Sequence, residues 1–367
     1  MDLRKSFRSF SLYFKEIDWP LFATTVAILL LSFINLYGID GWNGPFLYRH
    51  AIFIGIGLAV MVALSFFNYR YLKNYSSPVM IFYGLAIILL GWALLSPSIR
   101  GSHAWIIIGN FRFEPSELAK LAFIVVMAKY FSQRHSHINQ FRHIVISGTY
   151  LLILLGMILI QPDLGSAALL SLLWGGILLA AGINKRHFFL LMIVTIFTVY
   201  FGWIFMLKPY QKERLIAFTN PYRDPTGIGY NIIQSKIAIG SGHWLGNGLG
   251  KGSQASLGFL PEAHNDFAFA ALAEQFGLLG VIAVLGLVFI IIARILYIGE
   301  RTHNNFGKLF CLGMAILITV HTIVNAAVNL GLLPITGIPF SFISYGGSHL
   351  FALMLGLGIV QSIKRYG

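Results

Sequence analysis

The chain has 367 residues, of which 57% are hydrophobic and 11% are charged, and its mean hydropathy is +0.76. Uncharged apolar runs of about 18 residues or more recur without strand-like alternation, which excludes a soluble protein and a membrane barrel. The formal charge of +13 is spread over short clusters between these runs. That spread is typical of membrane topology and not of a nucleic-acid surface. We therefore expect an all-α polytopic membrane protein without a nucleic-acid partner.

Residues 1–19 are basic and aromatic, and we expect an amphipathic segment that lies along the cytoplasmic membrane surface before Pro20 opens the first span. No small-residue cleavage site follows, so the first span is predicted to stay uncleaved. The single cysteine, Cys311, lies inside an apolar run and offers no disulfide framework.

The apolar runs predict ten membrane-spanning helices in a single domain over residues 20–363, followed by a short tail at 364–367. An even number of spans places the two termini on one side. Basic residues concentrate in alternate connections, so both termini should be cytoplasmic, and nine of the thirteen acids then lie on the outer side. The predicted spans cover residues 20–37, 47–67, 77–95, 117–133, 144–161, 165–182, 188–207, 267–298, 308–330 and 346–363.

Two outer connections are longer than simple turns require. Residues 96–116 contain Trp and Phe side chains that suit the membrane interface. Residues 208–265 contain a predicted short amphipathic helix at 230–238 and a glycine-rich run at 240–252. Long connections are usually functional or disordered, and the aromatic content here argues against disorder.

The strongest candidate site lies where the longer connection meets the eighth apolar run. Glu262, His264, Asp266 and Glu274 stand within thirteen positions there, and charge at the membrane edge is costly to bury. The alternative is a loop end with solvated acids and a helix cap at Asn265 or Asp266. The spacing has no zinc-ligand repeat. A hard divalent cation, Mg²⁺ or Mn²⁺, held by Asp266 or Glu262 with a substrate diphosphate stays open.

Two further motifs each allow a structural or a functional interpretation. Glu117 and Lys120 are three positions apart on one helix face. They could form an ion pair that allows both charges to lie at the membrane edge, or Lys120 could bind a substrate phosphate while Glu117 holds its ammonium in place. Asp163 either caps the sixth span near Ser166 or joins a polar cavity.

Outer arginines run against the topology bias, so Arg49 and Arg214 are candidates for ion pairs or for binding an anion such as a diphosphate. The glycine-rich run is not a nucleotide P-loop, because Lys251 is followed by Gly252 and no strand precedes it. Its glycines offer close backbone approach and amide donors for an anionic headgroup, and the alternative is a flexible loop.

A segment rich in Gly, Pro and Ser separates the ninth and tenth spans and contains Ser344. Irregular backbone at membrane depth is tolerated only where protein buries it or where it lines a cavity. Together with the long connection, this break predicts an outward-facing polar cavity.

The whole chain resembles the SEDS family (shape, elongation, division and sporulation). It departs from the family's usual residues at Ala104, His50, Asn265 and Gln275. The motifs that carry the resemblance are Ile17-Asp18-Trp19, Phe113–Lys120, Gln161–Ser166, Ile237–Gly242, Leu260–Phe267, Pro334–Gly337 and Phe342–Ser348.

This resemblance implies a peptidoglycan glycosyltransferase of the bacterial cytoplasmic membrane. Such an enzyme polymerises lipid II on the outer face, releases undecaprenyl diphosphate and works beside a class B penicillin-binding protein. Compact length and short tails favour the elongation member of the family over the division member. The family's essential aspartate falls on Asp266, and no organic cofactor is expected.

The residues fit a mechanism in which Asp266 is the general base for the acceptor's 4-hydroxyl. One base and a single displacement at an α-linked donor predict inversion to a β linkage. We expect Lys120, Arg49, Arg214 and Lys251 to surround the diphosphates. The supporting positions around the substrate are Glu117, Asp163, Glu262, His264, Glu274 and Ser344.

Two other functions compete with this one. A flippase for the same lipid-linked precursor would use the cavity without a base, and a scaffold would recruit the penicillin-binding protein through its apolar flank. Transporters often contain internal repeats with paired broken helices. The sequence shows no convincing repeat and its acids cluster at one junction, which favours the enzyme.

Overall fold

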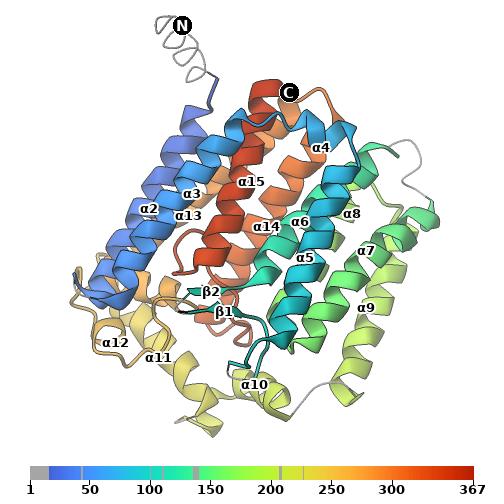
Figure 1. The fold of residues 1–367 in the computed structure, drawn as a ribbon. Coiled ribbons are helices and arrows are strands. Elements are labelled where there is room, and N and C mark those ends of the chain that lie inside the picture. The colour runs from blue at the N-terminus through green and yellow to red at the C-terminus, as the bar shows by residue number, and fades with distance from the viewer. Residues whose placement is uncertain are drawn as a thin grey trace, which may run out of the picture.

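A computed structural model describes residues 16–42, 44–99, 101–109, 111–134, 140–205, 209–225 and 227–367. The amphipathic segment expected at residues 1–19 falls outside this part up to residue 15. All ten predicted spans are helices (Figure 1). They are α2 (Trp19–Asp40), α3 (Pro45–Phe66), α5 (Ser77–Leu95), α6 (Pro115–Ser132), α7 (Phe141–Ile160), α8 (Leu164–Ala181), α9 (Lys185–Phe205), α13 (Ala268–Arg301), α14 (Asn305–Asn329) and α15 (Gly347–Tyr366).

Eight of the described helices are long and apolar enough to cross a membrane, which confirms the polytopic helical fold. The other two predicted spans, α6 and α15, are among the most buried helices. Every residue of α6 from Pro115 to Phe131 is buried, including Glu117 and Lys120. A helix surrounded by protein can carry polar residues that a lipid-facing helix cannot, so its sequence is less apolar.

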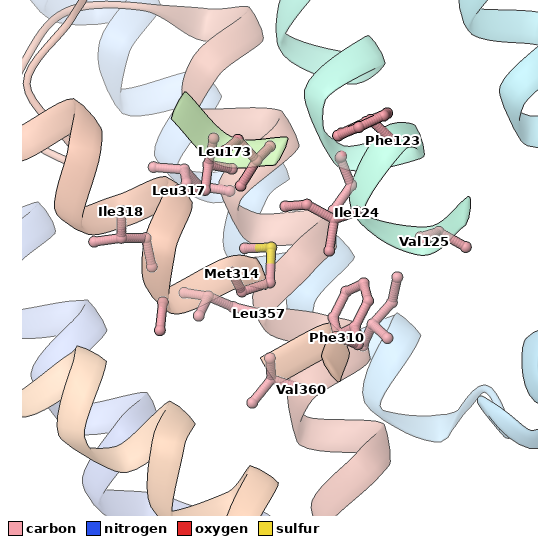
Figure 2. Close-up of a cluster of buried hydrophobic side chains, with 14 of the residues drawn as sticks. Phe123, Ile124, Val125, Leu173, Phe310, Met314, Leu317, Ile318, Leu357 and Val360 are labelled. Carbon is pink, nitrogen blue, oxygen red and sulfur yellow. The ribbon is translucent and has the colours of Figure 1, made fainter. Parts of the chain in front are cut away.

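The core lies where α6, α8, α14 and α15 meet. Figure 2 shows Ile124 of α6 directed toward the α14 side chains Leu317 and Met314, with Leu173 of α8 nearby. Phe123 and Val125 of α6 belong to the same buried cluster. Aliphatic and aromatic side chains are buried together there. The α14 and α15 members of this cluster are Phe310, Met314, Leu317, Ile318, Leu357 and Val360.

The last helix of the sequence, α15, occupies a central position in the bundle (Figure 1). It packs most extensively on α3 and also contacts α6, α13 and α14. Gly57 of α3 and Gly358 of α15 permit this close packing, because a Cβ at Gly358 would lie 3.0 Å from the Met61 carbonyl oxygen.

Residues 16–18 form hydrogen bonds with side chains at the C-terminal end of α15. Lys364 Nζ donates to the carbonyl oxygens of Glu16 and Ile17 at 3.1 Å, and the Asp18 amide donates to Gln361 Oε1 at 2.8 Å. Arg294 of α13 adds an ion pair to Asp18 at 2.5 Å. The two ends of the described chain therefore lie on the same side of the bundle, as an even number of spans requires.

Helix α9 stands at the edge of the bundle (Figure 1), and no residue of its apolar window is buried. Its aromatic and aliphatic side chains are exposed in the isolated chain, with Phe205 at 77% and Phe189 at 62%. A helix that is apolar on all sides and unburied is suited to a lipid environment.

The two long connections, 96–116 and 208–265, contain more secondary structure than the sequence suggested. The segment 96–116 includes an antiparallel hairpin, β1 (Ile106–Ile108) with β2 (Phe111–Phe113), in the register Ile107↔Arg112. This hairpin was not predicted. The helix predicted at 230–238 is confirmed within α11 (Ile228–Ser241). The remaining short elements are α4 (Arg70–Asn74), α10 (Pro209–Thr219), η2 (Pro221–Arg223) and α12 (Ser253–Ser256).

The glycine-rich run packs its backbone directly against α13. Gly277 has non-helical dihedral angles (φ 64°, ψ −165°) and interrupts α13, which the sequence did not predict. The Asn247 and Gly248 amides donate to the carbonyls of Glu274 and Gln275 at 2.9 and 3.1 Å. These two amides serve the fold and are not available to an anion.

Candidate active site

A cavity of ≈ 1480 Å³ is lined in part by the hairpin segment, by Leu215 of α10 and by Asn231 of α11. Figure 1 shows these elements at the end of the bundle opposite the start of α2. The other walls of the cavity come from the start of α3, the start of α8, the loop before α13 and the break between α14 and α15. The cavity predicted from the long connection and this break is therefore present. Its described charged lining residues are Arg49, Arg112, Glu114, Asp163, Glu262 and Asp266.

Asp266 lies in the cavity wall directly before α13. Two buried asparagines of α14 hold its backbone, because Asn325 Nδ2 and Asn329 Nδ2 each donate to the Asp266 carbonyl oxygen at 2.9 Å. Its carboxylate faces Gly337, where a Cβ would lie 4.0 Å from Asp266 Oδ2. The two asparagines thus fix the main chain of Asp266 at the cavity wall.

The loop before Asp266 is tied to the break between α14 and α15. The Tyr345 amide donates to the His264 carbonyl at 2.7 Å, and Ser344 Oγ donates to the Asn265 carbonyl at 2.7 Å. Ser344 is buried and does not line the cavity; its place is to position the loop.

Glu262 and His264 both line the cavity. Asn265 Nδ2 donates to Glu262 Oε2 at 2.9 Å, and His264 Nε2 lies 3.7 Å from the same oxygen. The His264 ring stacks on Phe46 at a centroid distance of 4.1 Å, which fixes its plane. The structure therefore brings Glu262, His264 and Asp266 into one wall, as predicted.

Two arginines supply positive charge to the cavity. Arg49 enters from the first turn of α3, and Arg112 enters from β2. Burial raises the pKa of the neighbouring Tyr345 hydroxyl, and the positive charge and hydrogen bond of Arg49 oppose that rise. Sequence analysis selected Arg49 but missed Arg112, although the same topology bias applies to both.

Asp163 and Glu114 form an acidic corner of the cavity. Asp163 Oδ1 accepts from the Ser166 amide at 3.0 Å, so this residue both caps α8 and lines the cavity. Burial, followed by the negative charges of Glu117 and Asp163, raises the pKa of Glu114 to about 8. The Ser116 hydroxyl donates to Glu114 Oε1 at 2.7 Å. Glu114 was not selected from the sequence because nothing local marks it as buried.

Glu117 and Lys120 are buried and are not among the lining residues. Lys120 Nζ lies 2.7 Å from Glu117 Oε1, so the ion pair predicted from their spacing forms. His349 Nδ1 lies 2.9 Å from Glu117 Oε2, and His321 Nε2 lies 3.5 Å from Lys120 Nζ. Sequence analysis missed both histidines.

Two other selected residues, Glu274 and Lys251, are not among the lining residues of the cavity. Glu274 is buried, and its carboxylate accepts from the amides of Gln254 and Ala255 at 2.8 and 2.9 Å, at the start of α12. Lys251 is exposed in the glycine-rich run. Arg214 belongs to α10, and its side chain lies outside the described part of the chain.

Comparison with known proteins places this geometry in a family. Residues 14–367 match the FtsW/RodA/SpoVE model, described as cell cycle protein. The chain is 33% identical over 351 residues to the peptidoglycan glycosyltransferase MrdB of Escherichia coli K12, covering 96% of this chain and 94% of that protein. It is also 33% identical over 379 residues to a probable peptidoglycan glycosyltransferase FtsW of Trichlorobacter lovleyi, covering 99% and 95%.

Two solved structures share the fold. One chain, from work on the structural coordination of polymerization and crosslinking by a peptidoglycan synthase complex, superposes with a TM-score of 0.82 at 31% identity, covering 95% of this chain and 98% of that one. The rod shape determining protein RodA of Thermus thermophilus superposes with a TM-score of 0.71 at 28% identity, covering 95% and 97%. With its ten helices, its cavity and a family match over nearly its whole length, the chain belongs to the FtsW/RodA/SpoVE (SEDS) family of multi-pass membrane peptidoglycan glycosyltransferases.

Proposed function

We propose that this enzyme polymerises lipid II on the outer face of the bacterial cytoplasmic membrane, with Asp266 as its general base. The main support is the setting of Asp266. Its backbone is held by Asn325 and Asn329, while its carboxylate faces a large cavity that also contains Arg49 and Arg112. A base held in this way is preorganised for proton transfer.

In the proposed reaction, the acceptor sugar's 4-hydroxyl attacks the anomeric carbon of the donor. The Asp266 carboxylate takes the hydroxyl proton as the new glycosidic bond forms. The bond between the anomeric carbon and the diphosphate oxygen breaks, and its electron pair leaves with undecaprenyl diphosphate. One displacement inverts an α-linked donor to a β-linked product.

The diphosphate needs positive charge, and the cavity offers Arg49 and Arg112 beside four carboxyl groups. Carboxylate oxygens suit a hard divalent cation, and Asp266 and Glu262 would hold Mg²⁺ or Mn²⁺ together with phosphate oxygens. When bound, the ion supplies charge neutralisation. Lys120 is proposed to act from beneath the wall through Glu117, and Arg214 and Lys251 are proposed to contact the lipid diphosphates from the long connection.

We further propose that both termini are cytoplasmic, that the protein serves cell elongation, and that a class B penicillin-binding protein is its partner. Alignment with MrdB and structural likeness to RodA support the elongation role, although a probable FtsW aligns at the same identity. The chain with a TM-score of 0.82 comes from a peptidoglycan synthase complex, which supports a partner.

The test is polymerisation of lipid II by purified protein, with and without the penicillin-binding partner, for wild type and Asp266→Asn. We expect wild type to make polymer, and Asp266→Asn to lose at least about 100-fold in rate while still binding lipid II. Equal rates would remove Asp266 as the base. Binding without polymer in wild type, with partner and Mg²⁺ or Mn²⁺ supplied, would favour the flippase.

The elongation role is tested by expression in cells depleted of their own elongation or division polymerase. Restored rod shape in the first strain, with no rescue of division in the second, is the expected result. The reverse pattern would assign the division role.

A further inference from the structure

Three side chains from three helices meet in the core behind the cavity. Glu117 of α6, His321 of α14 and His349 of α15 are each almost fully buried. Glu117 Oε2 lies 2.9 Å from His349 Nδ1 and 3.9 Å from His321 Nε2, and one ligand atom from each residue falls within a 4.8 Å group. Within the described ranges, no other three His, Cys, Asp or Glu side chains gather in this way.

The two imidazoles are not fully used by the protein. His321 Nδ1 lies 3.2 Å from the Pro339 carbonyl oxygen, which can only accept, so Nδ1 carries the proton and Nε2 directs its lone pair toward Glu117 and Lys120. Histidines that bind metals are commonly oriented by such a carbonyl. The nitrogen of His349 that lies among these groups is Nδ1, at 2.9 Å from Glu117 Oε2. Binding of an ion through Nδ1 would put the proton of the ring on Nε2, which is buried without a hydrogen-bond partner.

We propose that Glu117, His321 and His349 form a binding site for a divalent transition-metal ion of the Zn²⁺ class. Two imidazoles and one carboxylate are an established zinc ligand set that leaves a fourth position open. Zinc bonds of about 2.0–2.2 Å place tetrahedral ligand atoms about 3.3 Å apart. The two observed separations from Glu117 Oε2, 2.9 and 3.9 Å, lie on either side of that value.

The ammonium of Lys120 competes with a metal ion for the Glu117 carboxylate. Its ammonium lies 2.7 Å from Glu117 Oε1 and 3.5 Å from His321 Nε2, so it already neutralises the carboxylate. Two cations beside one buried carboxylate would leave uncompensated charge in a desolvated place. Metal binding therefore displaces Lys120 from Glu117, and the affinity of wild type is limited by this competition.

The site is distinct from the proposed catalytic centre. Asp266 contributes no ligand, whereas the Pro339 carbonyl that orients His321 belongs to the same break that forms part of the cavity wall. A bound ion would fasten α6, α14 and α15 behind that wall. Its first measurable effect is thus on metal content and thermal stability.

The experiment uses the full-length protein, purified in detergent and dialysed against buffered Zn²⁺, with bound zinc measured by mass spectrometry. Wild type should hold close to one zinc per chain. His321→Ala and His349→Ala should weaken binding at least about tenfold, Lys120→Met should strengthen it by a similar factor, and Asp266→Asn should match wild type. Co²⁺ loaded in place of zinc should give visible absorption bands in wild type only when both histidines are present.

His349→Gln serves as the variant that keeps a hydrogen-bond donor for Glu117 while removing an imidazole. Zn²⁺ should raise the Tm of wild type and leave that of His349→Gln unchanged. Absence of zinc from wild type would overturn the proposal, as would equal zinc in wild type and both histidine variants. Loss of zinc in Asp266→Asn would instead place the ion at the cavity carboxylates.

Discussion

At the scale of single residues, the carboxylates of this enzyme differ in what holds them. Asp163 and Glu274 accept hydrogen bonds from backbone amides through their side chains, so part of each carboxylate serves the fold. For Asp266 the structural bonds from asparagines fall on the backbone carbonyl instead. The proposed role of Asp266 as the base therefore draws on this backbone support and on its place in the cavity wall.

Asn329, one of the two asparagines that hold the Asp266 backbone, can be tested by substitution. Asn329 donates to the Asp266 carbonyl, and its own Oδ1 accepts from the Ala270 amide at 3.1 Å. Asn329→Ala leaves buried backbone groups unpaired, so we expect a loss of about 1–3 kcal/mol in stability and a fall in kcat. Tm and steady-state polymerisation measure the two effects. Unchanged kcat with lowered Tm would show that the contact supports only the fold.

The raised pKa of Glu114 predicts that stability and activity depend on pH. Its pKa is raised to about 8 from an ordinary value of 4.5, so the neutral acid stabilises the folded protein. That contribution is complete below the ordinary value and is lost as the pH rises through about 8. Above that pH a new negative charge also stands beside Asp163, where it repels an anionic diphosphate.

We therefore expect the Tm of wild type to fall between about pH 4.5 and pH 8, and its polymerisation rate to fall as the pH rises through about 8. Glu114→Gln should lose less of both. Glu300→Gln is the matched control, because it removes an acid near the C-terminal end of α13 that does not line the cavity. This variant should follow wild type. An alkaline loss of the same size in Glu114→Gln would exclude Glu114 as its cause.

Residue-level prediction from sequence worked where the partners are local. The spacing of Glu117 and Lys120 predicted their ion pair, and the position of Asp163 predicted its cap. It failed where the partners come from distant elements. His321 and His349 lie on separate helices, and no local pattern indicates that both reach Glu117.

At the scale of elements, the interruption of α13 at Gly277 holds the long connection in place. A Cβ at Gly277 would lie 2.6 Å from the Trp244 carbonyl oxygen, and its φ of +64° disfavours other residues. Sequence analysis expected one continuous span here, because a single glycine in an apolar helical run is usually tolerated.

Gly277→Ala should therefore destabilise the protein by about 1–3 kcal/mol and lower its Tm. Gly286→Ala, in the same helix with open space at its Cβ position, is the matched control and should be neutral or slightly stabilising. Equal Tm values for the two variants would contradict the packing role of Gly277.

The hairpin of β1 and β2 escaped prediction for a different reason. Its strands are three residues long, too short for an alternating pattern to be distinguished from an interfacial loop. Its position nevertheless brings Arg112 into the cavity.

At the scale of the whole molecule, ten apolar runs became ten helices because span length and backbone satisfaction in lipid leave few alternatives. The cavity was predicted in kind but not in its full lining. Its walls combine seven separate segments, whose meeting depends on how the helices pack.

The proposed orientation can be tested by cysteine labelling in a Cys311→Ala background, since the native thiol is buried. Leu257, in the connection before α13, is 70% exposed, and Tyr71 in α4 is 56% exposed. A membrane-impermeant maleimide should label Leu257→Cys in spheroplasts and should label Tyr71→Cys only after lysis. The opposite pattern would invert the topology.

The central place of α15 has a consequence for biosynthesis. The ribosome synthesises this helix after the other nine long helices. The helices α3, α6, α13 and α14 all pack against it, and Glu117 of α6 contacts its His349. Until α15 inserts, these four helices lack the helix that they pack against, and the buried Glu117 lacks its contact with His349. Insertion of the final helix is therefore the step that completes the core.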